Sequence, residues 1–148
     1  MIPHPEGGFY RELYRSASQV QPADDRPVRA ALTTIYFLLA DGMHSRWHRV
    51  ASDEVWHLYE GGPLDLFQAA PDGSAIQRIK LEPASAHGGP VHVVPAGHWQ
   101  AARAQCDYAL VGCTVGPGFD FADFSFLRDA PDALARLRQI DPTLAELA

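Results

Sequence analysis

The sequence has few of the features that mark secreted, membrane or nucleic-acid-binding proteins. Among 148 residues there are only two cysteines, Cys106 and Cys113, whose spacing fits neither a Cys-x-x-Cys metal pair nor a disulfide framework. The longest apolar run, residues 35–40, is far shorter than the roughly 18 residues of a membrane span. A net charge of −6 disfavours nucleic acid as a partner. The first residues lack the basic and apolar segments of a secretory signal, so we expect a reduced, cytoplasmic protein.

Glycine and proline are abundant instead, with twelve of each, which favours many tight turns and short strands. Apolar, β-branched and aromatic segments bounded by turn residues predict a series of strands. These are residues 9–16, 31–39, 45–50, 54–60, 64–70, 76–81, 91–94, 99–103 and 108–115. Asp41 and Gly42 are expected to end the second strand, and residues 71–74 to form a hairpin turn. The polar residues 20–27 are expected to be a loop.

The end of the chain changes period. Leu134, Leu137 and Ile140 recur at three-residue steps, which is typical of one face of a helix. Asp129 and Pro131 precede them, and an Asp before a Pro is a common start of a helix. Many strands with one short helix indicate an all-β barrel or double-sheet sandwich, such as a jelly roll with one open mouth. Such a mouth is a natural pocket for a small molecule.

Two stretches of the chain carry a recognisable spacing. In residues 42–61, GMHSRWHRVASDEVWHLYEG, the relevant positions are Gly42, His48, Val50, Glu54 and Gly61. In residues 89–104 they are Gly89, Pro95, Gly97, Gln100 and Ala104. Together they resemble the two motifs of the cupin superfamily, G-x5-H-x-H-x3-E-x6-G and G-x5-P-x-G-x2-H-x3-N. Three positions depart from these motifs: Val50 and Gln100 replace histidines, and Ala104 replaces an asparagine.

Other segments narrow the resemblance to small, single-domain, RmlC-like cupins of the cupin-5 type. They are HPEGGFYRELYRS at residues 4–16, SDEVWHLYEG at 52–61, VVPAGHWQAAR at 93–103 and GCTVGPGFDFADF at 112–124. The resemblance implies a double-stranded β-helix (a jelly-roll cupin barrel) with a short C-terminal helix. It also implies one domain over residues 1–148, with a barrel at about 9–126 and a helical tail at about 129–148, and commonly a homodimer. It does not supply a reaction.

Metal-dependent cupins hold a divalent metal with three imidazoles and one carboxylate inside the barrel. The resemblance places His48, Glu54 and Gln100 at these positions, which leaves one imidazole, one carboxylate and one weak amide ligand. One interpretation is therefore a weakly bound divalent metal on these three residues. The other needs no cofactor and makes His48 and Glu54 a catalytic pair for general acid–base chemistry.

Besides Gln100, three further residues are candidates for contact with a small-molecule ligand. Alternation along the strands places Arg46 on the inner face with His48, and Trp56 on the inner face with Glu54. Arg46 would hold an anionic group through a forked pair of hydrogen bonds. His98, at the start of the strand that carries Gln100, would line the mouth.

These residues support more than one function. We expect a cupin barrel that binds a small polar metabolite and acts as an enzyme. Its chemistry would be epimerase- or isomerase-like acid–base chemistry, or weak metal-assisted chemistry, on a sugar- or polyketide-type compound. The alternative is a non-catalytic sensor or carrier with a degenerate metal site. A purely structural protein would instead fill its cavity with its own side chains.

Overall fold

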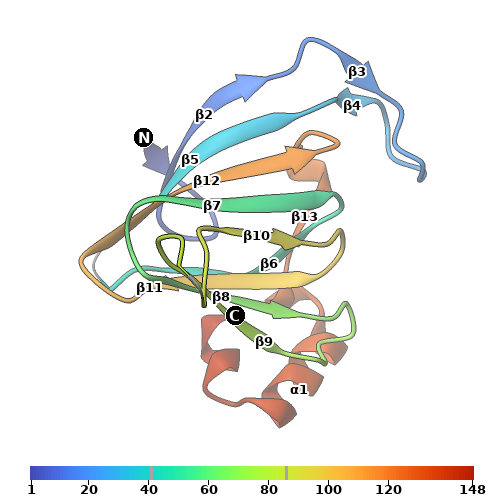
Figure 1. The fold of residues 1–148 in the computed structure, drawn as a ribbon. Coiled ribbons are helices and arrows are strands. Elements are labelled where there is room, and N and C mark those ends of the chain that lie inside the picture. The colour runs from blue at the N-terminus through green and yellow to red at the C-terminus, as the bar shows by residue number, and fades with distance from the viewer. Residues whose placement is uncertain (41, 86) are drawn as a thin grey trace.

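A computed structural model of the chain describes residues 1–40, 42–85 and 87–148 (Figure 1). Most strands belong to two antiparallel sheets. The six-stranded sheet has the order β1 (Ile2–Pro3), β2 (Phe9–Arg15), β5 (Thr33–Ala40), β12 (Tyr108–Gly116), β7 (Asp53–Gly61), β10 (Val91–Val94). The five-stranded sheet has the order β13 (Phe124–Phe126), β6 (His44–Val50), β11 (Trp99–Ala104), β8 (Leu64–Ala69), β9 (Gln77–Leu81). A separate hairpin of β3 (Gln19–Val20) and β4 (Arg29–Ala30) projects from one end.

The barrel core lies between the two sheets. Alternate residues of the strands point inward, so each sheet contributes one apolar face. From the six-stranded sheet come Phe37, Trp56 and Val111, and from the five-stranded sheet Leu66 and Ala102, all at most 1% exposed. This core closes one end of the barrel and leaves the other end for polar groups.

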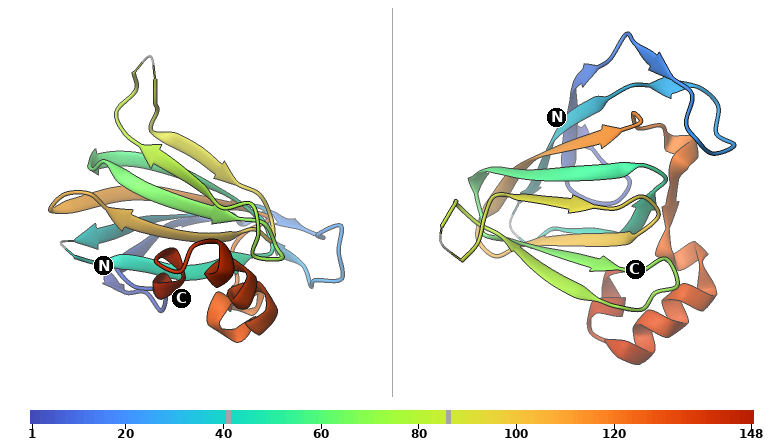
Figure 2. Two further views of the ribbon diagram at one scale, coloured as in Figure 1. Left: turned by 90° about the horizontal axis from the view of Figure 1, so that it is seen from below. Right: turned by 45° about the vertical axis from the view of Figure 1, so that its right-hand side comes forward.

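A second core covers the outer face of the five-stranded sheet. The chain ends in three 3-10 turns (Phe121–Asp123, Leu127–Asp129, Leu144–Leu147) and the helix α1 (Pro131–Ile140). Leu127 and Leu137 of this tail pack against Trp47, Phe67 and Trp99, on the side away from the six-stranded sheet (Figure 2). Among the described residues, no helix is long and apolar enough to cross a membrane.

The strands and the helix agree with the predicted positions to within a few residues, and the hairpin turn at residues 71–74 joins β8 to β9. The turn expected at Asp41–Gly42 depends on Asp41, which lies outside the described residues. The stretch expected to be a loop, residues 20–27, is the turn of the β3–β4 hairpin, with its first residue already in β3. Asp129 does not cap α1, because it belongs to the preceding 3-10 turn and Ala130 is the N-cap.

A β-bulge in β6 alters which of its side chains face inward. Gln100 of β11 pairs with His48, but Ala102 pairs with Ser45, so β6 has one extra residue between these pairs. Ser45 and His48 therefore both face the barrel interior, and Trp47 faces the tail. The predicted inward orientation of Arg46 is wrong: its side chain is exposed, and its guanidinium donates to the Pro5 carbonyl (3.2 Å).

Candidate active site

A cavity of about 250 Å³ lies at the end of the barrel where β5 and β7 begin and β6 and β12 end. Strands of both sheets, the turn before β2 and the segment after β12 all contribute to it. Its polar lining consists of His4, Glu6, Glu12, Arg15, Thr33, His48, Glu54, Cys113 and Asp120. Its apolar lining consists of Tyr10, Ile35, Phe37, Val50, Val115, Phe119, Phe121 and Phe124.

Glu6 reaches the cavity from a tight turn that precedes the barrel. The His4 amide donates to the Gly8 carbonyl (3.0 Å), and the Arg46 amide donates to the Glu6 carbonyl (2.8 Å), which fixes the turn against β6. Gly7 has φ +115°, and a Cβ there would lie 2.3 Å from the His44 carbonyl oxygen. Only glycine allows this approach, so the local sequence places the Glu6 side chain inside the barrel.

Glu6 and His48 form a buried pair on the floor of the cavity. Glu6 Oε2 lies 3.1 Å from His48 Nε2, and Ser45 Oγ donates to Glu6 Oε1 (3.0 Å). His48 Nδ1 lies 2.7 Å from the Arg46 carbonyl oxygen, which can only accept, so Nδ1 carries a proton. In a neutral imidazole, Nε2 is then the acceptor and faces Glu6.

Burial keeps this pair uncharged at neutral pH. Loss of solvent raises the pKa of Glu6 to about 8, an effect that its hydrogen bond from Ser45 only partly opposes. Loss of solvent also lowers the pKa of His48, against the smaller opposing effect of Glu54. Both shifts disfavour an ion pair, so we assign a neutral hydrogen bond in which the Glu6 carboxyl donates to His48 Nε2. Burial, and next the neighbouring His48, lower the pKa of His4 to about 4.

Glu54 is a second buried carboxyl on the same cavity, and other buried side chains hold it in place. Trp56 Nε1 donates to Gln100 Oε1 (2.8 Å), and Gln100 Nε2 donates to Glu54 Oε2 (2.5 Å). The Cys113 thiol lines the same cavity. Burial raises the pKa of Glu54, His48 opposes this, and the nearby Glu6 adds to it. Two carboxyls with raised pKa values therefore share one sheltered space.

Aromatic side chains wall the upper part of the cavity. The His4 ring stacks on Phe121 at 5.9 Å and meets Tyr10 edge-on at 4.7 Å. The His48 ring stacks on Phe124 at 5.2 Å. At the mouth, Arg15 pairs with Glu12, with side chains 46% and 43% exposed.

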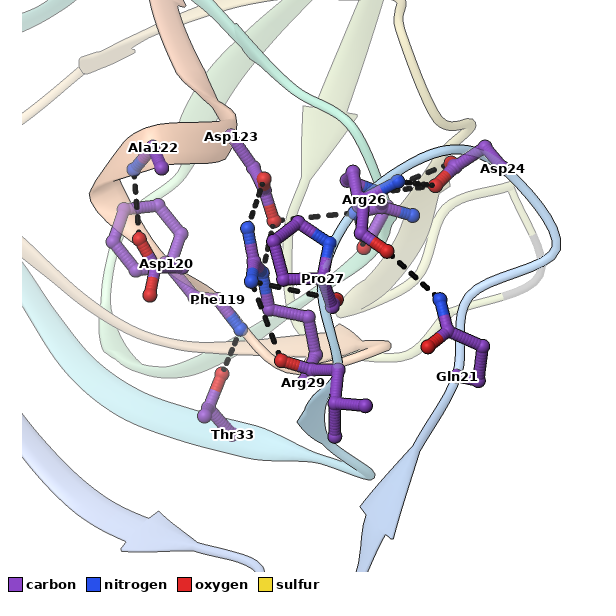
Figure 3. A network of polar contacts seen from close by, with 12 residues as sticks. Gln21, Asp24, Arg26, Pro27, Arg29, Thr33, Phe119, Asp120, Ala122 and Asp123 are labelled. Carbon is purple, nitrogen blue, oxygen red and sulfur yellow. Dashed lines mark hydrogen bonds and ion pairs between the residues drawn. The ribbon is translucent and has the colours of Figure 1, made fainter.

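Residues 118–124, called the cover segment here, close one side of the cavity and are held by ionic contacts. Arg29 donates to both carboxylate oxygens of Asp123 (2.8 and 2.9 Å), and Arg26 donates to one of them (3.3 Å), as Figure 3 shows. The Phe119 amide donates to Thr33 Oγ1 (2.9 Å) in the same view. The β3–β4 hairpin therefore fastens the cover segment to the barrel.

The structure brings together two of the predicted site residues and places the others elsewhere. His48 and Glu54 line the cavity. Gln100 and Trp56, at most 1% exposed, lie behind Glu54 and orient it. Neither Arg46 nor His98 is among the described residues that line the cavity. His98 lies in the turn before β11, where its amide donates to the Pro95 carbonyl (3.1 Å).

The donor set expected for a metal does not fit a retained divalent ion. Both nitrogens of His48 already have partners, the Arg46 carbonyl and Glu6. The Gln100 side-chain oxygen accepts a hydrogen bond from Trp56, so it is not free to bind a metal ion. Over residues 1–40, 42–85 and 87–148, no group of three or more His, Cys, Asp or Glu residues is arranged to hold a metal ion.

Several cavity residues were not predicted from the sequence. Glu6 and His4 come from the HPEGG segment, and Phe119, Phe121 and Phe124 from the cover segment. Two adjacent glycines after a Pro-Glu pair indicate a tight turn that can direct the glutamate side chain. The closely spaced phenylalanines of residues 118–124 indicate an apolar wall of a cavity. Nothing in the spacing of either segment shows that they meet over His48.

Comparisons with known proteins agree with this architecture. The family model described as "Cupin superfamily (DUF985)" matches residues 1–127. Protein SO0799 from Shewanella oneidensis is 34% identical, with a TM-score of 0.84 over 99% of this chain and 90% of that one. A hypothetical protein from Leishmania major is 32% identical, with a TM-score of 0.80 over 99% and 89%. The predicted resemblance and the jelly-roll fold with its short C-terminal helix are thereby confirmed.

More distant solved structures share the fold alone. Oxalate decarboxylase from Bacillus subtilis is 16% identical, with a TM-score of 0.59, and the match covers 87% of this chain and 30% of that one. No curated protein matched the chain. The comparisons therefore establish a family and an architecture.

Proposed function

This chain belongs to the cupin superfamily, in the family described as DUF985, and we propose that it is an enzyme that moves protons on a small molecule bound in the cavity. One observation carries the proposal. Glu6 Oε2 lies 3.1 Å from His48 Nε2 in a cavity that a second buried carboxyl, Glu54, also lines. Paired titratable groups whose surroundings shift their pKa values are typical of acid–base catalysis.

The acid in this proposal is Glu6. Its pKa of about 8 means that it holds a proton at neutral pH, while an ordinary carboxyl has lost its proton. His48 Nε2 accepts the hydrogen bond from Glu6 before the substrate binds, so it is a positioning residue, and the Glu6 O–H turns from His48 to the substrate carbonyl on binding.

The base is Glu54. The burial that raises its pKa makes its ionised form a stronger base than an exposed carboxylate. Glu54 takes a proton from the carbon next to a carbonyl group, and the electron pair of that C–H bond forms a C=C bond. The carbonyl π pair takes the proton of Glu6, which yields an enol. When Glu54 returns the proton to a different carbon of a conjugated enol, and the enol proton returns to Glu6, the double bond has moved and the molecule is isomerised without any redox partner; return to the same carbon gives hydrogen exchange alone.

A non-catalytic binding protein is the second candidate. Val50 stands where the cupin motif has a histidine, and His48 and Gln100 engage protein groups rather than pointing free atoms into the cavity. The same cavity would then retain a small molecule without changing it.

Proton exchange separates the two candidates. We expect the protein to speed up the exchange of hydrogen for deuterium next to the carbonyl of small ketones such as acetophenone in D₂O, followed by NMR. Removing a general acid or base costs about 10²–10⁴-fold in rate, so Glu6→Gln and Glu54→Gln should each lower the catalysed rate by at least about 10²-fold. Glu146→Gln, at an exposed position in the C-terminal tail, is the matched control and should keep it. Binding without exchange would favour the sensor or carrier.

A further inference from the structure

We propose that this cavity selects a small uncharged molecule built on a single flat ring, with its polar end on the Glu6–His48 floor. The inference rests on the proposed function for the place of the site, but not for its chemistry. Three properties of the cavity carry it: its charge, its walls and its size.

The cavity penalises buried charge of either sign. The same loss of solvent holds an acid, Glu6, and a base, His48, in their neutral forms. A charged ligand group on this floor would meet the same penalty, because charge is costly in a site without solvent. The floor offers it neutral hydrogen-bonding groups instead, namely the Glu6 carboxyl and the Cys113 thiol, because both nitrogens of His48 already have partners.

The charged side chains at the mouth already have partners. Arg15 is the one Lys or Arg among the described lining residues, and its guanidinium binds both carboxylate oxygens of Glu12 and the Phe119 carbonyl (2.8–3.2 Å). Asp120 accepts from the Ala122 amide (2.8 Å). Arg46, the residue expected to hold an anion, is exposed outside the cavity. The cavity therefore offers no unpaired cation at its mouth for a phosphate or carboxylate group.

The walls fit a flat apolar ring. Phe119 and Phe121 both line the cavity and pack edge-to-face, at 82° with centroids 5.0 Å apart. Ile35, Val50 and Val115 lie on the strands. A ring packs well against such faces and edges. A sugar would leave most of its hydroxyl groups without partners against these walls, which is costly.

The size allows little more than one ring. Sites for drug-sized ligands have volumes of about 300–1,000 Å³, and this cavity holds about 250 Å³. A ring with a short carbonyl-bearing substituent fits this volume, and the carbonyl would meet Glu6 at the floor. This favours the aromatic, polyketide-type compounds over the sugar-type compounds among the expected substrates.

The experiment measures the dissociation constants of matched probes by isothermal titration calorimetry. Two pairs differ almost only in charge: 4-nitroacetophenone with 4-acetylbenzoate, and 4-tert-butylacetophenone with 4-acetyl-N,N,N-trimethylanilinium. A third pair, acetophenone with cyclohexyl methyl ketone, differs in the flatness of the ring. We expect the neutral member of each charge pair, and the flat member of the third, to bind at least about fivefold more tightly, because burial of charge and poorer packing are both unfavourable.

Variants locate the binding. Phe121 is 51% exposed and lines the cavity, whereas Tyr59 is 55% exposed on an outer sheet face and is the matched control. Phe121→Ala should weaken acetophenone binding about tenfold through lost apolar contact, and Tyr59→Ala should leave it unchanged. Acetophenone binding by the unaltered chain without any proton exchange would overturn the proposed function and leave this ligand class in place.

Any of the following results would overturn the ligand class. One is tighter binding of the carboxylate probe that Arg15→Ala removes, which would reveal an anion site. Another is tighter binding of the trimethylanilinium probe, which would reveal a cation site. The third is no binding of acetophenone at millimolar concentration, or equal loss of binding in Phe121→Ala and Tyr59→Ala.

Discussion

At the scale of single residues, the unusual feature is an acid and a base that burial keeps neutral side by side. Ser45, Arg46 and His48 hold Glu6 in one orientation, although Glu6 lies outside the barrel strands. Burying an isolated carboxylate would destabilise the fold, and the proton in the hydrogen bond between Glu6 and His48 avoids that charge. Protonation of this pair should therefore change the free energy of unfolding of the whole chain.

The free energy of unfolding should depend on pH through these groups. Folding raises the pKa of Glu6 from 4.5 to about 8, so in that window the folded chain binds more protons and loses stability as pH rises. Folding lowers the pKa of His4 from 6.5 to about 4, which has the opposite effect below pH 6.5. We expect stability to fall by about 2 kcal/mol between pH 6.5 and 8, where the effect of Glu6 is no longer opposed by His4.

Urea denaturation at a series of pH values checks this slope. Glu6→Gln should make the slope shallower, because the amide does not titrate, and the raised pKa of Glu54 accounts for the part that remains. A slope that is the same in the variant would show that other groups produce it and that Glu6 is ionised in the folded chain.

The turn that carries Glu6 depends on one glycine. Gly7→Ala would place a Cβ 2.3 Å from the His44 carbonyl at φ +115°, and such strain costs on the order of 1–3 kcal/mol. Gly89→Ala is the matched control, because nothing lies within 4 Å of its Cβ position. Thermal unfolding should show a lower midpoint for Gly7→Ala than for Gly89→Ala. Equal midpoints would mean that the turn can move without cost.

At the scale of elements, the cover segment is fastened by one carboxylate. Asp123→Asn weakens the contacts with Arg26 and Arg29, whose side chains are 15% and 9% exposed. We expect the Gly118 and Phe119 amides, which donate to Ala30 and Thr33, to exchange with solvent about fivefold faster, since a partly exposed ion pair contributes about 1 kcal/mol.

Hydrogen exchange followed by NMR reports on each amide. Asp25→Asn, an exposed position in the same hairpin loop, is the control and should leave both rates unchanged. If Asp123→Asn also leaves them unchanged, the aromatic packing alone holds the cover segment in place.

The elements themselves were largely predictable from sequence, and the site was not. Alternation and turn residues place β5, β7 and β12 because these patterns are local. The bulge in β6 is not local: it depends on pairing with β11, and it turns Arg46 outward while His48 keeps its inward position. The cupin spacing located His48 and Glu54, but Glu6 meets His48 only through the fold, across 42 positions of the chain.

At the scale of the whole molecule, the chain has two cores that share one sheet. Leu137 of α1 is fully buried in the outer core. Leu137→Ala should lower the free energy of unfolding by about 2–5 kcal/mol, the usual cost of such a cavity. Ile140→Ala, 53% exposed on the same helix, should cost less than about 1 kcal/mol.

Chemical denaturation compares the two variants. Equal small losses would mean that α1 only lies against the barrel and does not stabilise it. The homodimer that the family resemblance implies stays a prediction, and light scattering at micromolar concentration tests it.

Glu6, the acid of the proposed site, lies in the short turn before β2 and not on a strand of the barrel. Glu6→Gly would remove the carboxyl side chain and leave every strand around the cavity in place. The space that it opens is about the size of a small carboxylic acid. Acetate or formate from the buffer should diffuse into that space and restore proton delivery in a concentration-dependent way. Such chemical rescue of the exchange rate would show that the acid at position 6 supplies the proton for the proposed reaction.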